Sequence, residues 1–128
     1  MKTVLVIDDD PDIRDLVIWK LRQAGYATRA EGDGEAGLAT AGGEGTGNGP
    51  PDLVLVDRMM PKLSGIDVCR ALRENPRTAD IPVILLTAKA QEAELERGLA
   101  AGADDYIVKP FSPKEMLKRV EAVLGPAG

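Results

Sequence analysis

Short runs of apolar residues recur along the chain, and most of them end at a polar or charged residue. The runs at 3–7, 53–56, 81–86 and 105–108 predict strands, and those at 53–56 and 81–86 match strands buried on both faces, as in a parallel sheet. The stretch at 26–30 is more polar, which predicts a strand at the edge of the sheet.

Between these runs, apolar residues recur every three or four positions, as on one face of a helix. The first helix is expected to follow a cap at Asp9 or Asp10, with Pro11 at its first position, and to end at Gly25. Further helices are predicted at 34–40, 66–74 and 92–101, and Ser112 is expected to cap a last one. The predicted core-facing residues of the first helix are Ile13, Leu16, Val17, Leu21 and Ala24.

Strands and helices alternate five times, which predicts right-handed βαβ crossovers and a parallel sheet with helices on both faces. We therefore expect an α/β, doubly wound (βα)5 fold of the flavodoxin-like kind, with a five-stranded sheet of order 2-1-3-4-5. One domain is expected over 1–125, followed by a C-terminal tail at 126–128. The glycine-rich stretch at 41–51 has no periodicity and is predicted to be a surface loop, with no role evident from its composition.

The composition is that of a globular protein with one core: 128 residues, 44% hydrophobic and 29% charged. A formal net charge of −5 gives no basic footprint, so no direct nucleic-acid binding by this chain is expected. Cys69 is the single cysteine, which excludes an internal disulfide. No apolar run has membrane length and the N-terminus lacks a signal peptide's apolar region, so we expect a cytoplasmic protein without membrane contact.

Polar side chains follow four of the predicted strands. Asp8 and Asp9 follow the first strand, Asp57 the third, Thr87 the fourth and Lys109 the fifth. The carboxyl ends of parallel strands meet at one edge of the sheet, where ligands of doubly wound folds bind. Taken singly, each residue also suits a helix cap or a solvated loop. Together they predict a site of three carboxylates, a hydroxyl and an ammonium group.

Three carboxylates in contact repel one another, at roughly 4 kcal/mol per pair for a separation of about 4 Å and an effective dielectric near 20. The chain contains no histidine, so a metal that relieves this repulsion must bind to oxygen. That requirement favours Mg²⁺, with Mn²⁺ as an alternative. A carboxylate beside such an ion is suited to attack a phosphoryl group and form an acyl phosphate.

The chain resembles the receiver domain of bacterial two-component response regulators over essentially its whole length. The resemblance rests on VLVIDDDP at 4–11, DRMMP at 57–61 with SG at 64–65, LTA at 86–88 and GADDYIVKPF at 102–111. It implies that Asp57 is the phosphoacceptor, which receives its phosphate from a sensor histidine kinase or a histidine phosphotransfer protein. It also implies a signalling switch rather than an ordinary enzyme, one that assists its own phosphorylation and slow autodephosphorylation.

The same resemblance assigns roles to other residues. Asp8 and Asp9 would bind Mg²⁺ together with Asp57, and the main-chain carbonyl of Met59 would be a further ligand. Lys109 and Thr87 would contact the phosphoryl group. Thr87 and Tyr106 would form the switch pair, in which the hydroxyl moves towards the phosphoryl group and the ring turns inward. The Lys109–Pro110 peptide bond is expected to be cis.

The last third of the chain most resembles receivers of the OmpR/PhoB kind. These pair through the fourth helix, fifth strand and fifth helix, which implies a phosphorylation-dependent homodimer. Whether the chain is a complete regulator or part of one with an effector domain stays open, as does the identity of the output partner. Four residues match the pattern of that pairing face and three depart from it: Asp104, Asp105, Glu115 and Arg119 match, whereas Leu95, Ala100 and Glu121 do not.

Family receivers dock their kinase near the first helix and the loop after the fifth strand. We therefore interpret Arg14, Ile18 and Arg22, with Pro110 and Phe111, as a docking surface, although a solvated helix face explains the first three equally well. Trp19 beside the core stripe is expected to be half-buried.

Three other functions are compatible with parts of the pattern. An aspartate phosphatase would need a second acid two residues after Asp57, where this chain has Met59. A flavodoxin-like cofactor binder would need a phosphate cradle after the first strand, where this chain has aspartates. A receiver that binds partners without phosphorylation would not need the five strand-end residues intact.

Overall fold

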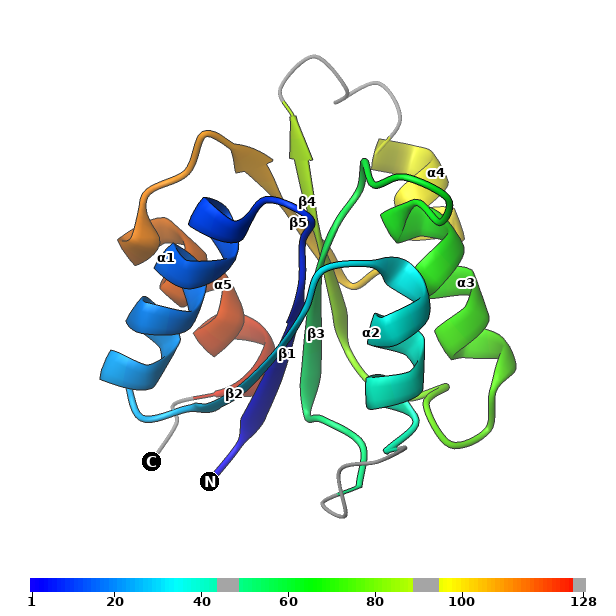
Figure 1. Cartoon of the computed structure of the whole chain (residues 1–128), viewed down its shortest axis with the longest axis horizontal. Helices are drawn as coiled ribbons and strands as arrows, with labels where there is room; N and C mark the ends of the chain where they lie inside the picture. The colour runs from blue at the N-terminus through cyan, green and yellow to red at the C-terminus, as the bar shows by residue number, and fades with distance from the viewer. Residues whose placement is uncertain (44–48, 89–94, 126–128) are drawn as a thin grey trace.

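The computed structural model describes residues 1–43, 49–88 and 95–125. Within these ranges five strands alternate with five helices (Figure 1). The strands are β1 (Thr3–Ile7), β2 (Ala27–Glu31), β3 (Leu53–Asp57), β4 (Val83–Ala88) and β5 (Asp105–Lys109). The helices are α1 (Pro11–Gln23), α2 (Gly34–Ala41), α3 (Gly65–Glu74), α4 (Leu95–Ala100) and α5 (Pro113–Leu124).

The strands form one parallel sheet of order β2-β1-β3-β4-β5, which confirms the predicted fold and strand order. The boundaries differ from the predicted ones by one or two residues. β4 begins after Pro82 rather than at Ile81, because proline has no N–H to give to the ladder. The predicted start of the fourth helix, 92–94, lies outside the described residues.

Successive residues of each strand face opposite sides of the sheet and build two separate cores. In β1, Leu5 and Ile7 pack with α2 and α3, whereas Val4 and Val6 pack with α1 and α5. Figure 1 shows the two layers, with α1 and α5 on one side of the sheet and α2, α3 and α4 on the other. The side to which a strand-end residue points therefore follows from the alternation of the residues before it.

The structure corrects two expectations for α1. Val17 and Leu21 are fully buried, but Leu16 is 42% exposed and Trp19 is 57% exposed rather than half-buried. A helix turns by about 100° per residue, so Ile18 and Leu16 lie on opposite sides of Val17, and Ile18 is the one that packs against the core. The buried stripe is narrower than the apolar content of the helix suggested, and apolar side chains remain on the surface.

Side chains that accept main-chain N–H groups explain where helices α1 and α3 begin. The Asp10 side chain accepts the N–H groups of Asp12 and Ile13, so Asp10 rather than Asp9 caps α1. Ser64 and Asp67 form a reciprocal capping box at the start of α3. In the part of the chain that the structure describes, no helix is both long and apolar enough to cross a membrane.

Candidate functional site

Strand register brings the first two acids of the site together. Ile7 of β1 pairs with Val56 of β3, so Asp8 and Asp57 follow as neighbours at the carboxyl ends of adjacent strands. Each continues the alternation of residues that face α1 and α5, so both carboxylates leave the sheet on that side. One carboxylate oxygen each from Asp8, Asp9 and Asp57 lies within 4.8 Å of the others. The predicted three-carboxylate cluster is therefore present.

Lys109 joins the cluster from β5. Its Nζ lies 3.2 Å from Oδ2 of Asp8 and 3.3 Å from Oδ1 of Asp57. Asp8 is fully buried, and its Oδ1 accepts the N–H of Asp10 at 2.9 Å. The Lys109–Pro110 peptide bond is cis, as expected. One ammonium group is thus shared by two carboxylates.

Asp57 is 7% exposed, which is unusual for an ionisable side chain. Burial raises the pKa of its carboxyl group to about 6, and the charge of Asp8 adds to the rise while Lys109 opposes it. The ammonium group therefore offsets only part of the negative charge. Three convergent carboxylate oxygens with incomplete neutralisation fit a hard divalent cation such as Mg²⁺.

The loop after β3 lies against the main chain of Asp57. The N–H of Gly65 donates to the carbonyl of Arg58 at 2.9 Å, and a Cβ at Gly65 would lie 2.5 Å from the Asp57 carbonyl oxygen. The N–H of Met59 points to Oδ1 of Asp57 at 3.4 Å. The Met59 carbonyl remains a predicted metal ligand.

Thr87 and Tyr106 lie on the other face of the sheet. Thr87 continues the β4 positions that face α3, and Tyr106 packs against the same core. Thr87 is fully buried, and its Oγ1 reaches the Ala88 carbonyl at 3.5 Å, the long limit of a hydrogen bond. The hydroxyl is weakly held. Sharing a face with Tyr106 is the arrangement that a switch pair needs, but their movement stays a prediction.

Three of the predicted docking residues on α1 already contact other parts of the chain. Nη1 of Arg14 donates to the Asp8 carbonyl at 2.9 Å, and Nε of Arg22 donates to Oγ1 of Thr28 at 2.8 Å. Ile18 packs against the α1–α5 core. Sequence periodicity placed Arg14 on an outer helix face, but it gave no signal that the side chain turns back to the site.

An apolar groove of about 360 Å³ adjoins the site on the α1 side, where Pro110 and Phe111 do lie. Sequence analysis expected docking in this region but assigned Ile13 and Leu16 to the core rather than to a groove. Leu16 and Lys109 each contribute to its walls. Its full lining is Ile13, Leu16, Lys109, Pro110 and Phe111.

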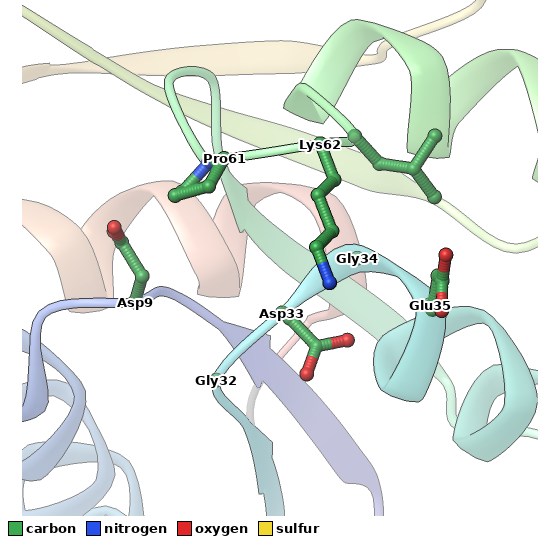
Figure 2. A pocket seen from close by; sticks show the side chains of 8 residues that line it. Asp9, Gly32, Asp33, Gly34, Glu35, Pro61 and Lys62 are labelled. Atoms are coloured by element: carbon green, nitrogen blue, oxygen red, sulfur yellow. The ribbon is translucent and has the colours of Figure 1, made fainter.

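A second cavity, of about 170 Å³, opens beside Asp9 between the start of α2 and the loop before α3. Figure 2 shows the Lys62 side chain reaching across it towards Asp33 and Gly34, with Asp9 and Pro61 on the opposite side. Lys62 has a φ of 69°, which is uncommon for a residue other than glycine. The cavity carries charges of both signs and extends the polar surface of the site.

A model of the family described as the response regulator receiver domain matches residues 4–121. The chain belongs to this family. The match confirms the resemblance seen in the motifs and identifies the protein as a two-component receiver domain. Receiver domains of response regulators are signalling switches, which sets this one apart from the phosphatase and cofactor-binding alternatives.

Curated relatives agree with this assignment. The receiver domain is 48% identical over 124 residues to the DNA-binding dual master transcriptional regulator RpaA of Synechocystis sp., across 97% of the chain and 49% of RpaA. It is 43% identical over 128 residues to the phosphate regulon transcriptional regulatory protein PhoB of Pseudomonas aeruginosa, across 99% of the chain and 53% of PhoB. These identities confirm the likeness to OmpR/PhoB regulators, and the chain spans about half the length of these relatives.

A solved structure has the same fold. The receiver domain of a sensor histidine kinase from Pseudomonas aeruginosa superposes with a TM-score of 0.84 at 28% identity, over 97% of this chain and 98% of that one. That structure has a magnesium ion coordinated in its active site cleft. The acidic cluster of Asp8, Asp9 and Asp57 is in keeping with a magnesium site of this kind.

Proposed function

We propose that Asp57 accepts a phosphoryl group from a phosphohistidine of a sensor histidine kinase or a histidine phosphotransfer protein. The observation that carries this proposal is the Lys109 ammonium group, placed 3.3 Å from the buried Asp57 and 3.2 Å from Asp8. A surface aspartate needs no such partner. A carboxylate kept out of water, beside a fixed cation and an acidic cluster, is suited to nucleophilic attack on phosphorus.

In this reaction an Asp57 carboxylate oxygen attacks the phosphorus atom and forms an acyl phosphate. The phosphorus–nitrogen bond to the donor breaks, and its electron pair returns to the imidazole, which then takes up a proton. The Lys109 ammonium group and the Thr87 hydroxyl stabilise the charge on the phosphoryl oxygens. In the slow autodephosphorylation, water attacks the phosphorus atom of the acyl phosphate, the phosphorus–oxygen bond to Asp57 breaks, and inorganic phosphate, a proton and the free carboxylate are released.

Four groups would hold the metal: the carboxylates of Asp8, Asp9 and Asp57 and the main-chain carbonyl of Met59. Mg²⁺, or Mn²⁺ in its place, supplies positive charge that neutralises the carboxylates and polarises the phosphoryl group. The protein's own contribution is to bring these oxygens together before the phosphodonor arrives.

Phosphorylation then biases an equilibrium between two conformations. The Thr87 hydroxyl leaves its long contact with the Ala88 carbonyl and donates to the phosphoryl group. Tyr106, on the same face of the sheet, turns into the space that this movement opens. The change is read on the face of α4, β5 and α5, where Arg119 pairs with Asp105 at 3.0 Å. A phosphorylation-dependent homodimer through that face is part of this proposal.

The phosphodonor would dock over α1 and the apolar groove next to it. Lys109 is a wall of the groove and also a neighbour of Asp57, so a protein seated there has its phosphohistidine beside the acceptor. Leu16 and Trp19 are exposed on the adjoining helix and suit the apolar face of a partner helix. RpaA is described as DNA-binding; with a net charge of −5, this chain would reach an output through an effector domain or partner.

Acetyl phosphate with Mg²⁺ tests the chemistry without a kinase. Intact-mass spectrometry is expected to show one added phosphate on the wild-type protein and none on Asp57→Asn. Asp80→Asn is the matched control, because Asp80 is an exposed aspartate on the loop before β4. Its adduct should equal that of the wild type.

The same adduct on Asp57→Asn would refute the assignment of the phosphoacceptor. Steady-state release of phosphate from a generic phosphomonoester, at many turnovers per minute, would instead identify a hydrolase.

A further inference from the structure

Arg14 lies close to the acidic cluster, but the proposed chemistry gives its positive charge no role. Its Nη1 donates to the Asp8 carbonyl at 2.9 Å. A Cβ at Gly32, just after β2, would lie 3.1 Å from the same nitrogen, so the guanidinium group packs against that glycine. The side chain therefore spans from the first turn of α1 to the ends of β1 and β2.

The carbonyl that Arg14 holds belongs to the peptide group that joins Asp8 to Asp9. The Asp8 side chain is held independently of that peptide by Lys109 and by the N–H of Asp10. The Asp9 side chain is exposed and accepts no hydrogen bond from the described part of the chain. The backbone before Asp9 therefore sets the direction of its Cα–Cβ bond, and with it the positions that the carboxylate can reach.

We propose that Arg14 is a positioning residue of the metal site. By fixing the peptide between Asp8 and Asp9, it keeps the exposed Asp9 carboxylate turned towards Asp57. This inference rests on the proposed function, because it concerns the same magnesium site. Groups behind the ligands of a metal site commonly affect metal affinity in this way.

The charge of Arg14 acts in the opposite direction. A cation beside an acidic cluster repels a divalent ion, so removal of the charge alone would strengthen Mg²⁺ binding. Loss of positioning would weaken it. The sign of the change in affinity therefore separates the two effects.

The experiment is a Mg²⁺ titration of the chelator-treated full chain, followed by two-dimensional amide NMR. Arg14→Met is expected to weaken binding about tenfold. Arg14→Lys is expected to recover part of the loss, because a long side chain with a donor remains. Arg29→Met is the matched control: its Nη1 also donates to a main-chain carbonyl, that of Gly49 at 2.8 Å, away from the acids.

Two further variants show the route of the effect. Gly32→Ala would place a methyl group 3.1 Å from Nη1 of Arg14, close enough to shift the guanidinium group by a few tenths of an ångström, so it should weaken Mg²⁺ binding less than Arg14→Met does. In an Asp9→Asn background, Arg14→Met should cause no further loss, since the carboxylate that it positions is gone. If Arg14→Met does not fold, Arg14→Lys decides the question, because Mg²⁺ binding equal to or tighter than that of the wild type would contradict a positioning role.

The outcomes separate the two proposals. A wild-type chain that binds no Mg²⁺ would overturn the proposed function together with this inference. Wild-type binding with equal or tighter binding by Arg14→Met, or an unchanged tenfold loss in the Asp9→Asn background, would overturn the role of Arg14 alone.

Discussion

Among single residues, Asp57 bears the main energetic cost of the site. Its carboxyl group is buried next to a second buried carboxyl, that of Asp8, with one shared ammonium group. Because its pKa is about 6 in the folded protein and 3.8 as the ordinary value, the folded state binds this proton more tightly than the unfolded state. Ionised Asp57 therefore opposes folding above pH 6, and the penalty is relieved as the pH falls from about 6 to about 4.

Removing this charge should stabilise the metal-free protein. In the presence of a chelator at pH 8, we expect Asp57→Asn to raise the free energy of unfolding by about 1 to 3 kcal/mol, since one pKa unit corresponds to about 1.4 kcal/mol. The gain should shrink when the pH is lowered to 5, where the wild-type carboxyl group is largely protonated. Urea unfolding at both pH values measures the difference. An Asp57→Asn protein no more stable than the wild type at pH 8 would contradict this account, and Asp80→Asn should change little.

The identities of the site residues could be predicted from the sequence, but their energetics could not. Asp8, Asp57 and Lys109 were found because each follows a strand, and parallel strands end at one edge. The sharing of Lys109 and the pKa of Asp57 depend on distances between strands that are far apart in the chain. Arg14 was misplaced for a related reason: helical periodicity gives the face of a Cα atom, not the direction of a long side chain.

Among the elements, the start of α3 packs most closely against the site. The helix begins at Gly65, whose Cα approaches the main chain of Asp57 and Arg58. Only a residue without a Cβ fits there, because the space is taken by main-chain atoms that cannot rotate away. The strand that carries the acceptor and the helix that follows it are therefore held at a fixed separation.

Gly65→Ala should disturb both stability and chemistry. The new methyl group would lie 2.5 Å from the Asp57 carbonyl oxygen, so β3 and α3 must separate. We expect a loss of about 1 to 3 kcal/mol in unfolding free energy and slower labelling by acetyl phosphate. Gly42→Ala is the control, since its Cβ would meet atoms no closer than 3.6 Å. Wild-type stability and labelling rate in Gly65→Ala would show that the close approach is unimportant.

The number and order of elements were predictable, because apolar runs and helical spacing alternate without interruption along the chain. The exposure of Leu16 and Trp19 was not predictable, because an apolar residue on a helix is expected in the core whether or not another element covers it. The apolar groove was not predictable for the same reason, because it forms only when the loop after β5 lies beside α1.

In the molecule as a whole, the surface proposed for the phosphodonor and the surface proposed for the output lie on different elements except at β5. The donor surface consists of α1, Lys109 at the end of β5 and the loop after it, and the output surface of α4, β5 and α5. Variants of the α1 residues on the donor surface should therefore affect phosphotransfer without altering the chemistry of Asp57.

Leu16→Lys tests this separation. The substitution puts a charge into the groove wall, so phosphotransfer from a cognate sensor kinase, found by phosphotransfer profiling, should slow about tenfold or more. Labelling by acetyl phosphate should stay at the wild-type rate, because Leu16 does not contact the acids. Ala30→Lys, at an exposed position of β2, is the control. Unchanged kinase transfer in Leu16→Lys would remove the groove from the docking surface.

The sheet divides the site between its two sides, with Asp57 and Lys109 towards α1 and α5, and Thr87 and Tyr106 towards α3. In the proposed mechanism, phosphate capture uses Lys109 on one side and Thr87 on the other, whereas Tyr106 acts only in the switch, so the two processes meet at Thr87. A ligand bound on the Tyr106 side would leave phosphorylation of the receiver intact and block its output. A ligand bound on the Lys109 side would prevent phosphorylation.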